Sequence, residues 1–542
     1  MLKRYLIYLF LITSTPLFAQ NTLDWVQLLG GNEADYVSKI VVDQQANIYG
    51  IGHFRDSLNQ NQSLGNTDIL IFKYNASGQL LWTKQLGGIG EDLGKSITIN
   101  DSGSLFITGH YRNTLYYDND SLISSGNTDA FVARLDLQGN LLWIKSIGNA
   151  GFETGTSIAC DALGNTYLTG TFEDSLNIDN QSLQTYGTLN NFIVKLNPSG
   201  LLVWHNSLGT PTFDNLKDIQ LDSSGNVYIV GYFRNTLSGV LGQLNSNGDQ
   251  DALLLKLDVN GQVLWWKNLG GPLADFGFAL EIKSPYIYWT GVHQDTMLVN
   301  GLPQISEGEF DAFLIQADLQ GDINWIQHVG GLDDSKAFDL GATTDGRVYL
   351  VGYFEGTALW ANDSFSSRGP RHVPSDVFIS EYSSSGNYIS VHTLQGPMTD
   401  FATGIALIDS SFYIAGVCQD SICFDSLLEI SQAVSSDIFV AKYHKSNLTN
   451  ITTIQPAPLN CQLYPNPSQG FAQLDFKLKK ASAVDLIIYD HSGIILQKIT
   501  QTSRAAGQQK IILKTRQLPN GFYYIAIKTD EQYQQLSLII QH

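Results

Sequence analysis

The sequence predicts an all-β protein, and three observations support this fold class. A segment of about 60 residues recurs along most of the chain. Within each copy, apolar and polar residues alternate with a period of two, which is the pattern of β-strands. Short turns such as "DALGN" and "DSSGN" separate the alternating runs, and their Gly and Asn residues tolerate a positive φ. No stretch of the repeated part has a convincing helical pattern.

One column of the aligned copies holds Trp at every position except the last. The column consists of Trp25, Trp82, Trp143, Trp204, Trp265, Trp325 and Ser390, with spacings of 57, 61, 61, 61, 60 and 65 residues. A period of this length and regularity indicates a repeat architecture.

Each copy contains four predicted strands. In the first copy they are "KIVVD" (39–43), "NIYGIGHF" (47–54), "DILIFKY" (68–74) and "LLWTKQLGG" (80–88). Four-stranded units that recur in this way predict a β-propeller, whose blades bury their faces against one another.

The last copy lacks its own fourth strand, because "DIFVAKYH" (437–444) runs into a polar linker. A spare fourth strand, "LDWVQLLGG" (23–31), stands at the other end of the repeated region. The sequence therefore predicts a seven-bladed β-propeller closed by the N-terminal strand, with six or eight blades as alternatives.

The repeat resembles a family of bacterial β-propeller repeats that read G-x-x-D-x-F-V-x-K-L-D-x-x-G-x-x-x-W-x-x-x-x-G-G. Two clear copies are "GNTDAFVARLDLQGNLLWIKSIG" (126–148) and "GDQDALLLKLDVNGQVLWWKNLGG" (248–271). The resemblance implies a scaffold and not a particular activity, so function has to be argued from a site.

The first 19 residues have the layout of a secretory signal, with Lys3 and Arg4 ahead of an apolar run. We expect cleavage near Ala19, no transmembrane segment and an exported mature chain. The predicted domains are a signal peptide (1–19), the propeller (20–445), a linker (446–458) and a small Ig-like β-sandwich (459–542).

The C-terminal segment carries a second resemblance. Its marker residues are Tyr464, Pro465, Asn466, Pro467, Gly493 and Gly521. They resemble the C-terminal sorting domain of the type IX secretion system of Bacteroidota. The resemblance implies that the secretion machinery is a partner and that the chain is secreted or displayed on the outer-membrane surface, with the tail either cleaved for release or exchanged for an anchor.

Charge and cysteine content exclude some functions. Residues 21–458 contain 20 Lys and Arg against 46 Asp and Glu, a net charge of −26, whereas residues 459–542 contain 9 against 5, a net charge of +4. Such an acidic body repels nucleic acid and anionic membranes. Four cysteines cannot form a disulfide framework. Cys418 and Cys423 are close enough in sequence to bridge one loop or to remain two thiols. We expect a monomer.

One acidic column is a candidate cation site. Four residues after the second Gly position of "LGG" stand Asp35, Asp92, Glu153, Asp214, Asp275 and Asp400, and Asp334 stands one place early in the sixth copy. These carboxylates suggest a rim around the central opening that binds Ca²⁺. The other interpretation is that each carboxylate caps the backbone N–H groups of its own turn. No other cofactor is predicted.

The sixth copy has a long loop that breaks the symmetry. From Gly352 to Asp376 it takes 24 residues, against 20 in the second, fourth and fifth copies, and it contains Arg368, Arg371 and His372. We expect these cations to bind an anionic glycan or an acidic protein group, or else to pair with neighbouring carboxylates.

The sequence contains no recognisable catalytic constellation. It favours a non-enzymatic binding or adhesion scaffold for a glycan or a protein. The alternative is a polysaccharide-degrading enzyme, a glycosidase or lyase, built on the propeller. A structural component of the cell envelope is a third interpretation.

Overall fold

The structure is a computed structural model. It describes residues 21–58, 61–118, 120–183, 185–212, 214–361, 363–367, 375–424, 427–430, 436–445, 461–490, 495–529 and 533–541. The chain divides into two compact units, residues 1–446 and 447–542. Every regular element in the described ranges is a β-strand, which confirms the all-β class. In these ranges no helix is long and apolar enough to span a membrane.

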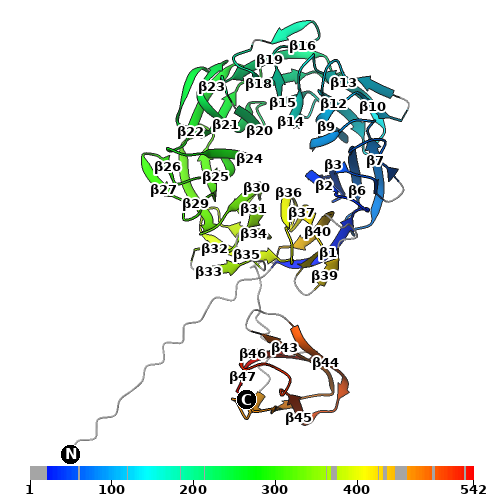
Figure 1. The fold of residues 1–542 in the computed structure, drawn as a ribbon, viewed down its shortest axis with the longest axis vertical. Helices are drawn as coiled ribbons and strands as arrows, with labels where there is room; N and C mark the ends of the chain where they lie inside the picture. The colour runs from blue at the N-terminus through cyan, green and yellow to red at the C-terminus, as the bar shows by residue number, and fades with distance from the viewer. Residues whose placement is uncertain are drawn as a thin grey trace, which may run out of the picture. The chain divides into compact units, whose positions relative to one another are not determined.

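The first unit is a ring of antiparallel sheets, with one strand of each sheet facing the centre (Figure 1). We call each group of four paired strands a blade. The inner strands are β2 (Tyr36–Val42), β8 (Leu93–Ile99), β14 (Thr154–Cys160), β20 (Asp214–Leu221), β24 (Asp275–Lys283), β30 (Ser335–Ala342) and β36 (Phe401–Ile408). Neighbouring inner strands contact one another around the ring, including β36 and β2.

A second and a third strand follow in each blade. The second strands are β3 (Ile48–Phe54), β9 (Ser104–Tyr111), β15 (Thr166–Glu173), β21 (Val227–Gly239), β25 (Tyr286–His293), β31 (Val348–Phe354) and β37 (Ser411–Cys418). The third strands are β6 (Asp68–Tyr74), β12 (Asp129–Asp136), β18 (Leu189–Leu196), β22 (Gly242–Leu257), β28 (Asp311–Asp318), β34 (Asp376–Tyr382) and β40 (Asp437–His444). Both faces of these strands are largely buried because a neighbouring blade covers each face.

A fourth strand lies at the outer edge of each blade. These strands are β7 (Leu80–Leu86), β13 (Leu141–Ile147), β19 (Leu202–Gly209), β23 (Val263–Leu269), β29 (Ile323–Gly331), β35 (Tyr388–Leu394) and β1 (Thr22–Leu29). The N-terminal strand β1 pairs antiparallel with β40, for example Val26 with Ala441, in one sheet with β37 and β36. Residues from both ends of the repeated region thus share a sheet.

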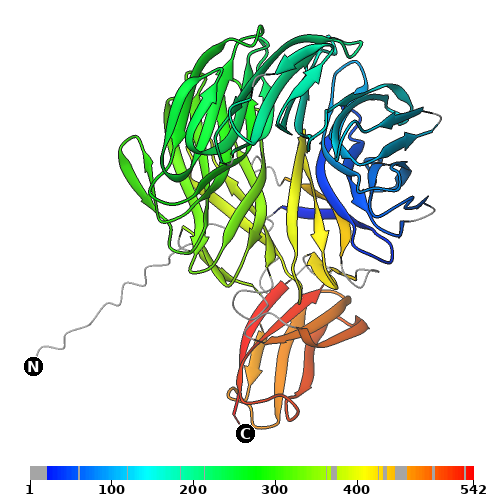
Figure 2. The same cartoon turned by 45° about the horizontal axis from the view of Figure 1, so that its top comes forward.

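Short hairpins extend from the connection between second and third strands. They are β4 (Ser57–Leu58) with β5 (Asn61–Gln62), β10 (Thr114–Tyr117) with β11 (Asp120–Ile123), β16 (Leu176–Ile178) with β17 (Gln181–Leu183), β26 (Thr296–Val299) with β27 (Leu302–Ile305), β32 (Thr357–Trp360) with β33 (Asp363–Ser366), and β38 (Ser421–Phe424) with β39 (Leu427–Ile430). In the remaining blade, β21 and β22 continue pairing outward to Gly239 and Gly242. Figure 2 shows the same ring from a tilted direction.

The Trp column joins consecutive blades. The Trp143 indole Nε1 donates a hydrogen bond to the Pro198 carbonyl oxygen in the next blade at 3.0 Å, and Trp204 does the same to Val259 at 3.0 Å. The turn that receives Trp204 contains Gly261, which has a φ of +81° and whose Cβ, if present, would lie 2.9 Å from the indole. Glycine is required here by the positive φ and by the close approach of the ring.

The second unit has two sheets with one shared core. One sheet contains β41 (Cys461–Tyr464), β42 (Phe471–Leu478) and β45 (Gly507–Lys514), and the other contains β44 (Ile495–Arg504), β43 (Ser482–Asp490), β46 (Gly521–Thr529) and β47 (Tyr533–Ile540). Buried side chains from both sheets, such as Phe476 and Ile525, form one hydrophobic cluster. This arrangement is a small β-sandwich.

Deleting residues 21–31 removes β1 and leaves the outer edge of β40 unpaired. Because an open, apolar strand edge recruits other chains, we expect this variant to aggregate or to lose cooperative unfolding. Thermal unfolding and size-exclusion chromatography measure both effects, with a chain that begins at residue 21 as the control. A truncated chain that melts like this control would show that β1 does not close the ring.

Candidate functional site

The inner strands surround an axial channel. A cavity of about 340 Å³ is lined by side chains of β2, β8, β20, β24, β30 and β36. A second cavity of about 100 Å³ is lined by residues of all the inner strands. Lys39 and Asp339 line both cavities, so the two are neighbouring levels of one channel. This channel is the candidate functional site.

A β-bulge in every inner strand places one extra residue at the channel. The register of the inner strand shifts near its start, for example between Val37 and Lys39 and between Leu216 and Asp218. A bulge of this kind re-aims a side chain and is common beside active sites. The extra residues all line the smaller cavity: Ser38, Lys95, Thr156, Lys217, Phe278, Phe338 and Thr403.

In two blades the residue after the bulge is an Asp that connects neighbouring blades. Asp218 Oδ1 accepts a hydrogen bond from Ser157 Oγ at 2.8 Å, and its Oδ2 accepts one from the Leu280 amide at 3.1 Å. Asp339 Oδ2 accepts one from the Ile405 amide at 3.0 Å. These carboxylates therefore bridge inner strands from different blades.

Lys39 lines the channel at the same level as the Asp218 and Asp339 carboxylates. Its Nζ is 3.4 Å from Asp218 Oδ1. Burial alone lowers the pKa of Lys39, but the Asp218 and Asp339 carboxylates outweigh burial and hold the pKa above its usual value. Burial raises the pKa of Asp339 to about 6, against the effect of Lys39. Burial also raises the pKa of Glu281 to about 7, and Lys283 partly opposes that shift.

Lys95 and Lys217 form a cationic side of the smaller cavity. Within the described residues, neither ammonium group forms an ion pair. Burial lowers the pKa of Lys217 to about 8, and repulsion from Lys95 lowers it further. Burial lowers the pKa of Lys95, and Glu91 partly offsets this shift. The Lys217 Nζ lies 5.6 Å from the centre of the Tyr232 ring.

Aromatic rings form the other side of the same cavity. The ring centres of Phe278 and Phe338 are 6.1 Å apart. Phe276 lies 6.1 Å from Phe278, and Phe401 lies 6.2 Å from Phe338. Phe278 and Phe338 are both partly exposed. One cavity therefore has lysines on one side and apolar ring surfaces on the other.

The predicted acidic column is buried and bonded to its own turns. Asp35, Asp92, Glu153, Asp214, Asp275 and Asp400 have no exposed surface. Asp35 Oδ2 accepts a hydrogen bond from the Gly31 amide at 2.7 Å, and Asp275 Oδ2 accepts one from the Gly271 amide at 2.8 Å. Asp92 and Glu153 bind the amides of Gly88 and Asn149 in the same way.

Two members of the acidic column deviate from this turn pattern. Asp400 Oδ1 accepts a hydrogen bond from the Gln419 amide at 3.0 Å. In the sixth copy the column position is Ser335, and Asp334 instead pairs with Lys336 at 3.2 Å.

Pairs of carboxyl groups, rather than one shared rim, occur at this level. Burial raises the pKa of Asp275 to about 8, and the nearby Asp251 raises it further. Burial likewise raises the pKa of Asp92 to about 7, and the nearby Asp68 raises it further. Across the described ranges, no three acidic, His or Cys side chains are grouped so that they could hold one metal ion. Ca²⁺ binding by this column stays a prediction, and it would have to use such pairs.

The structure describes most of the sorting-motif residues and the two cysteines, but not the cations of the long loop. Arg368, Arg371, His372 and Gly493 lie outside the described residues. In the sorting motif, the Tyr464 hydroxyl donates a hydrogen bond to Asp475 at 2.7 Å, and Asn466 Oδ1 accepts one from the Ile539 amide at 2.7 Å. Pro465 and Pro467 lie in the same turn, and Gly521 begins β46. Neither Cys418 nor Cys423 forms a disulfide bond within the described residues.

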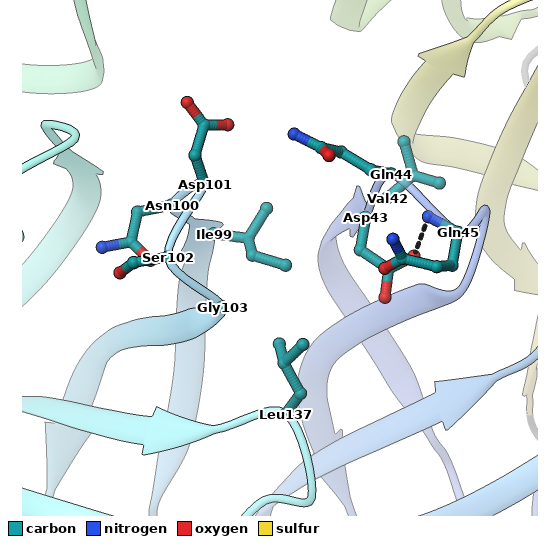
Figure 3. A pocket seen from close by; sticks show the side chains of 10 residues that line it. All are labelled: Val42, Asp43, Gln44, Gln45, Ile99, Asn100, Asp101, Ser102, Gly103 and Leu137. Carbon is teal, nitrogen blue, oxygen red and sulfur yellow. Dashed lines mark hydrogen bonds between the residues drawn. The ribbon is translucent and has the colours of Figure 1, made fainter.

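A third hollow, of about 200 Å³, lies between the turns after β2 and β8 (Figure 3). Figure 3 shows Asp101 and Gln44 on opposite sides of the gap. Asp43 accepts hydrogen bonds from the amides of Gln45 at 2.9 Å and Asn47 at 2.8 Å. Its carboxylate is therefore occupied in shaping the turn, and the hollow is a weaker candidate than the channel.

Comparisons with known proteins identify the C-terminal unit. Residues 462–541 match the family of secretion system C-terminal sorting domains. A stretch of 247 residues, 38% of the chain, is 26% identical to an uncharacterized WD repeat-containing protein of Acanthamoeba polyphaga mimivirus and covers 18% of that protein. A stretch of 316 residues, 53% of the chain, is 26% identical to the regulatory protein FlaEY of Caulobacter vibrioides and covers 33% of it. The chain thus spans about a third or less of these curated relatives.

Among solved structures, the WD40 β-propeller domain of Doa1 aligns with a TM-score of 0.28 and 10% identity, covering 61% of this chain and 94% of that domain. This likeness is too distant to indicate a function. The chain is a β-propeller repeat protein with a C-terminal sorting domain of the type IX secretion system, as the sequence motifs predicted. The tail indicates export, to the cell surface or into the medium.

The buried carboxyl groups should make stability depend on pH. A carboxyl whose pKa is higher in the folded than in the unfolded state contributes stability at low pH that is lost as the pH rises. For Asp275, with a folded pKa of about 8, this loss extends from about pH 4 to pH 8. The slope for one such group is at most about 1.4 kcal/mol per pH unit.

We therefore expect Asp275→Asn to reduce the decrease in the free energy of unfolding between pH 5 and pH 8. Urea unfolding at several pH values measures it, with the exposed Asp322→Asn as a matched control. An unchanged pH dependence in Asp275→Asn would contradict the burial argument.

Proposed function

We propose that this protein is an exported binding scaffold, which holds an extracellular glycan or protein at the axial channel of its propeller. The single observation that carries the proposal is the variation of the bulge residues. The blades repeat one design, yet the bulge positions hold hydroxyl, Lys and Phe side chains at one level of one cavity. A ligand needs a place where the ring is not symmetric, and the bulge side chains make the smaller cavity such a place.

We also propose that the ring has seven blades and is closed by β1. The pairing of β1 with β40 supports this arrangement. The Thr403 hydroxyl donates a hydrogen bond to the Val37 carbonyl oxygen at 2.9 Å, which links the last inner strand to the first. The proposed domain limits are those of the sequence prediction, namely signal peptide 1–19, propeller 20–445, linker 446–458 and sorting domain 459–542.

The long loop of the sixth copy is a second element of the proposed binding surface. Arg368, Arg371 and His372 bring positive charge to a body whose net charge is strongly negative. Arg side chains form paired hydrogen bonds with carboxylate or sulfate groups. The loop would add affinity for the anionic groups of a glycan or a protein.

A panel of algal and plant polysaccharides tests the proposed function. We expect the full chain to retain one or more of them in affinity electrophoresis without producing new reducing ends. Retention that is lost after heat unfolding would show that the folded ring is required. If no polysaccharide or extracellular protein is retained, the proposal of a binding scaffold is wrong.

A polysaccharide-cleaving enzyme is the second candidate, and one observation favours it. Glu281 and Asp339 line the larger cavity, and burial raises the pKa values of both to about 7 and about 6. A carboxyl with a raised pKa beside a second carboxyl is the arrangement that general acid catalysis of glycoside cleavage uses. New reducing ends that disappear in Glu281→Gln would favour this candidate over the scaffold.

Removing residues 459–542 should separate folding from export. The C-terminal unit has its own sheets and its own core, so the remaining chain should keep its fold. We expect the truncated protein to accumulate in the periplasm of the producing bacterium with an unchanged circular dichroism spectrum. Cell fractionation and protease treatment of intact cells measure this, with the full chain as the control. Undiminished surface display would refute the role of the tail.

A further inference from the structure

We propose that the smaller cavity of the channel binds one acidic sugar residue, with its carboxylate between Lys95 and Lys217 and its ring against Phe278 and Phe338. This inference rests on the proposed function and names the ligand class that the channel takes. The four residues belong to different inner strands, β8, β20, β24 and β30, and all of them occupy the bulge position.

The fold itself does not require lysine at the bulge position. Ser38 Oγ donates a hydrogen bond to the Gly94 carbonyl oxygen at 2.7 Å, and Thr403 Oγ1 donates one to the Val37 carbonyl oxygen at 2.9 Å. Each of these bonds connects an inner strand to that of the next blade. A small hydroxyl group therefore meets the structural need at this position, whereas no such bond is found for Lys95 or Lys217 in the described part of the ring.

Lys95 and Lys217 are partly covered, and burial lowers the pKa of both ammonium groups. Partial removal of an ammonium group from water without a paired anion costs free energy. The nearest acidic level of the channel is already engaged, since Asp218 binds Lys39 and bridges two blades. An incoming carboxylate would supply the anion that Lys95 and Lys217 lack.

The Phe278 and Phe338 rings indicate which chemical group carries the carboxylate of the ligand. Phe278 and Phe338 present ring surface to the cavity, and both are only partly covered. One face of a pyranose ring carries axial C–H groups and is apolar, so it packs on an aromatic ring and loses contact with water. A uronic acid residue combines such a face with a carboxylate on one edge.

Cavity size and overall charge favour a short ligand or a chain end. The cavity of about 100 Å³ holds the acidic end of one sugar residue and not several residues. The chain carries a net charge of −20, which repels long polyanions. At physiological ionic strength this repulsion is screened beyond about 8 Å, so the two lysines dominate inside the cavity.

Titration calorimetry with the full chain tests the inference. The probes are a galacturonic acid trimer, a sulfated galactose trimer, an unsulfated, neutral galactose trimer and a tri-glutamate peptide. We expect the uronic acid trimer to bind, and the neutral trimer to bind at least tenfold more weakly, because removal of a charge-assisted contact costs about one power of ten or more in affinity. Weaker binding of the sulfated trimer would assign the site to carboxylates, and equal binding would extend it to anionic sugars in general.

The variants Lys95→Gln and Lys217→Gln should each weaken uronic acid binding at least tenfold. Phe338→Leu should weaken it while keeping the preference over the neutral trimer. Lys267→Gln is the matched control, since Lys267 pairs with Asp322 away from the channel and its loss removes the same charge. Thermal unfolding of each variant verifies that the ring is intact.

The outcomes separate the two levels of the proposal. Uronic acid binding that is unchanged in both lysine variants would overturn this inference and leave the binding scaffold in place. Equal or tighter binding of the tri-glutamate peptide would overturn the choice of a sugar. If none of the probes and none of the polysaccharide panel binds the folded chain, both the inference and the proposed function fail.

Discussion

The contact between a Trp of one blade and the glycine turn of the next is the interaction on which the ring depends. Trp25, for example, donates a hydrogen bond to the Ala76 carbonyl oxygen at 3.1 Å and packs against Gly78, whose φ is +81°. A Cβ on that glycine would lie 2.7 Å from the indole. The turn must therefore contain glycine for two reasons, its backbone conformation and the ring beside it. The first five blades carry both halves of the contact, one for each neighbour.

This constraint explains the one irregular position in the Trp column. Ser390 belongs to β35, and the blade that follows takes its third strand from β40 and its fourth strand from β1. No turn joins those two strands, because they come from opposite ends of the repeated region. A Trp at position 390 would have no glycine turn to receive it. The Ser390 hydroxyl instead donates to Glu381 at 3.4 Å, and the Asn21 side chain donates to the same carboxylate oxygen at 3.4 Å.

Much of the fold could be predicted because each of its features repeats. The period-two pattern, the glycine turns and the Trp column give the same result in copy after copy, so a single exception such as Ser390 does not obscure it. The turn-capping role of Asp35 and Asp275 was also foreseeable, because a residue that recurs in nearly every repeat usually meets a need of every repeat. That a second carboxyl such as Asp251 lies beside Asp275 could not be foreseen, since the two belong to different blades.

The channel was not predictable in the same way, because its lining has no shared residue type. Lys95, Lys217, Phe278 and Phe338 occupy one structural position, but a bulge leaves no mark in a sequence pattern that alternates with period two. The long loop around Arg368 is visible in the sequence, since an insertion changes the number of residues between two strands. A comparison of the residues three places after the acidic column would have found Lys and Phe where other copies have Ser or Thr.

The residues that hold the blades together and the residues that line the channel lie at different levels of the propeller. The Trp contacts hold the outer part of the blades, and the hydrogen bonds of Asp218 and Asp339 hold the inner strands. Between these levels, Ser38 and Thr403 link neighbouring inner strands, whereas the bulge side chains of the other blades differ from one another. Lys95 and Lys217 are partly exposed, and Lys217 lies over the Tyr232 ring. Neither forms an ion pair within the described residues, which is why the proposed ligand is an anion.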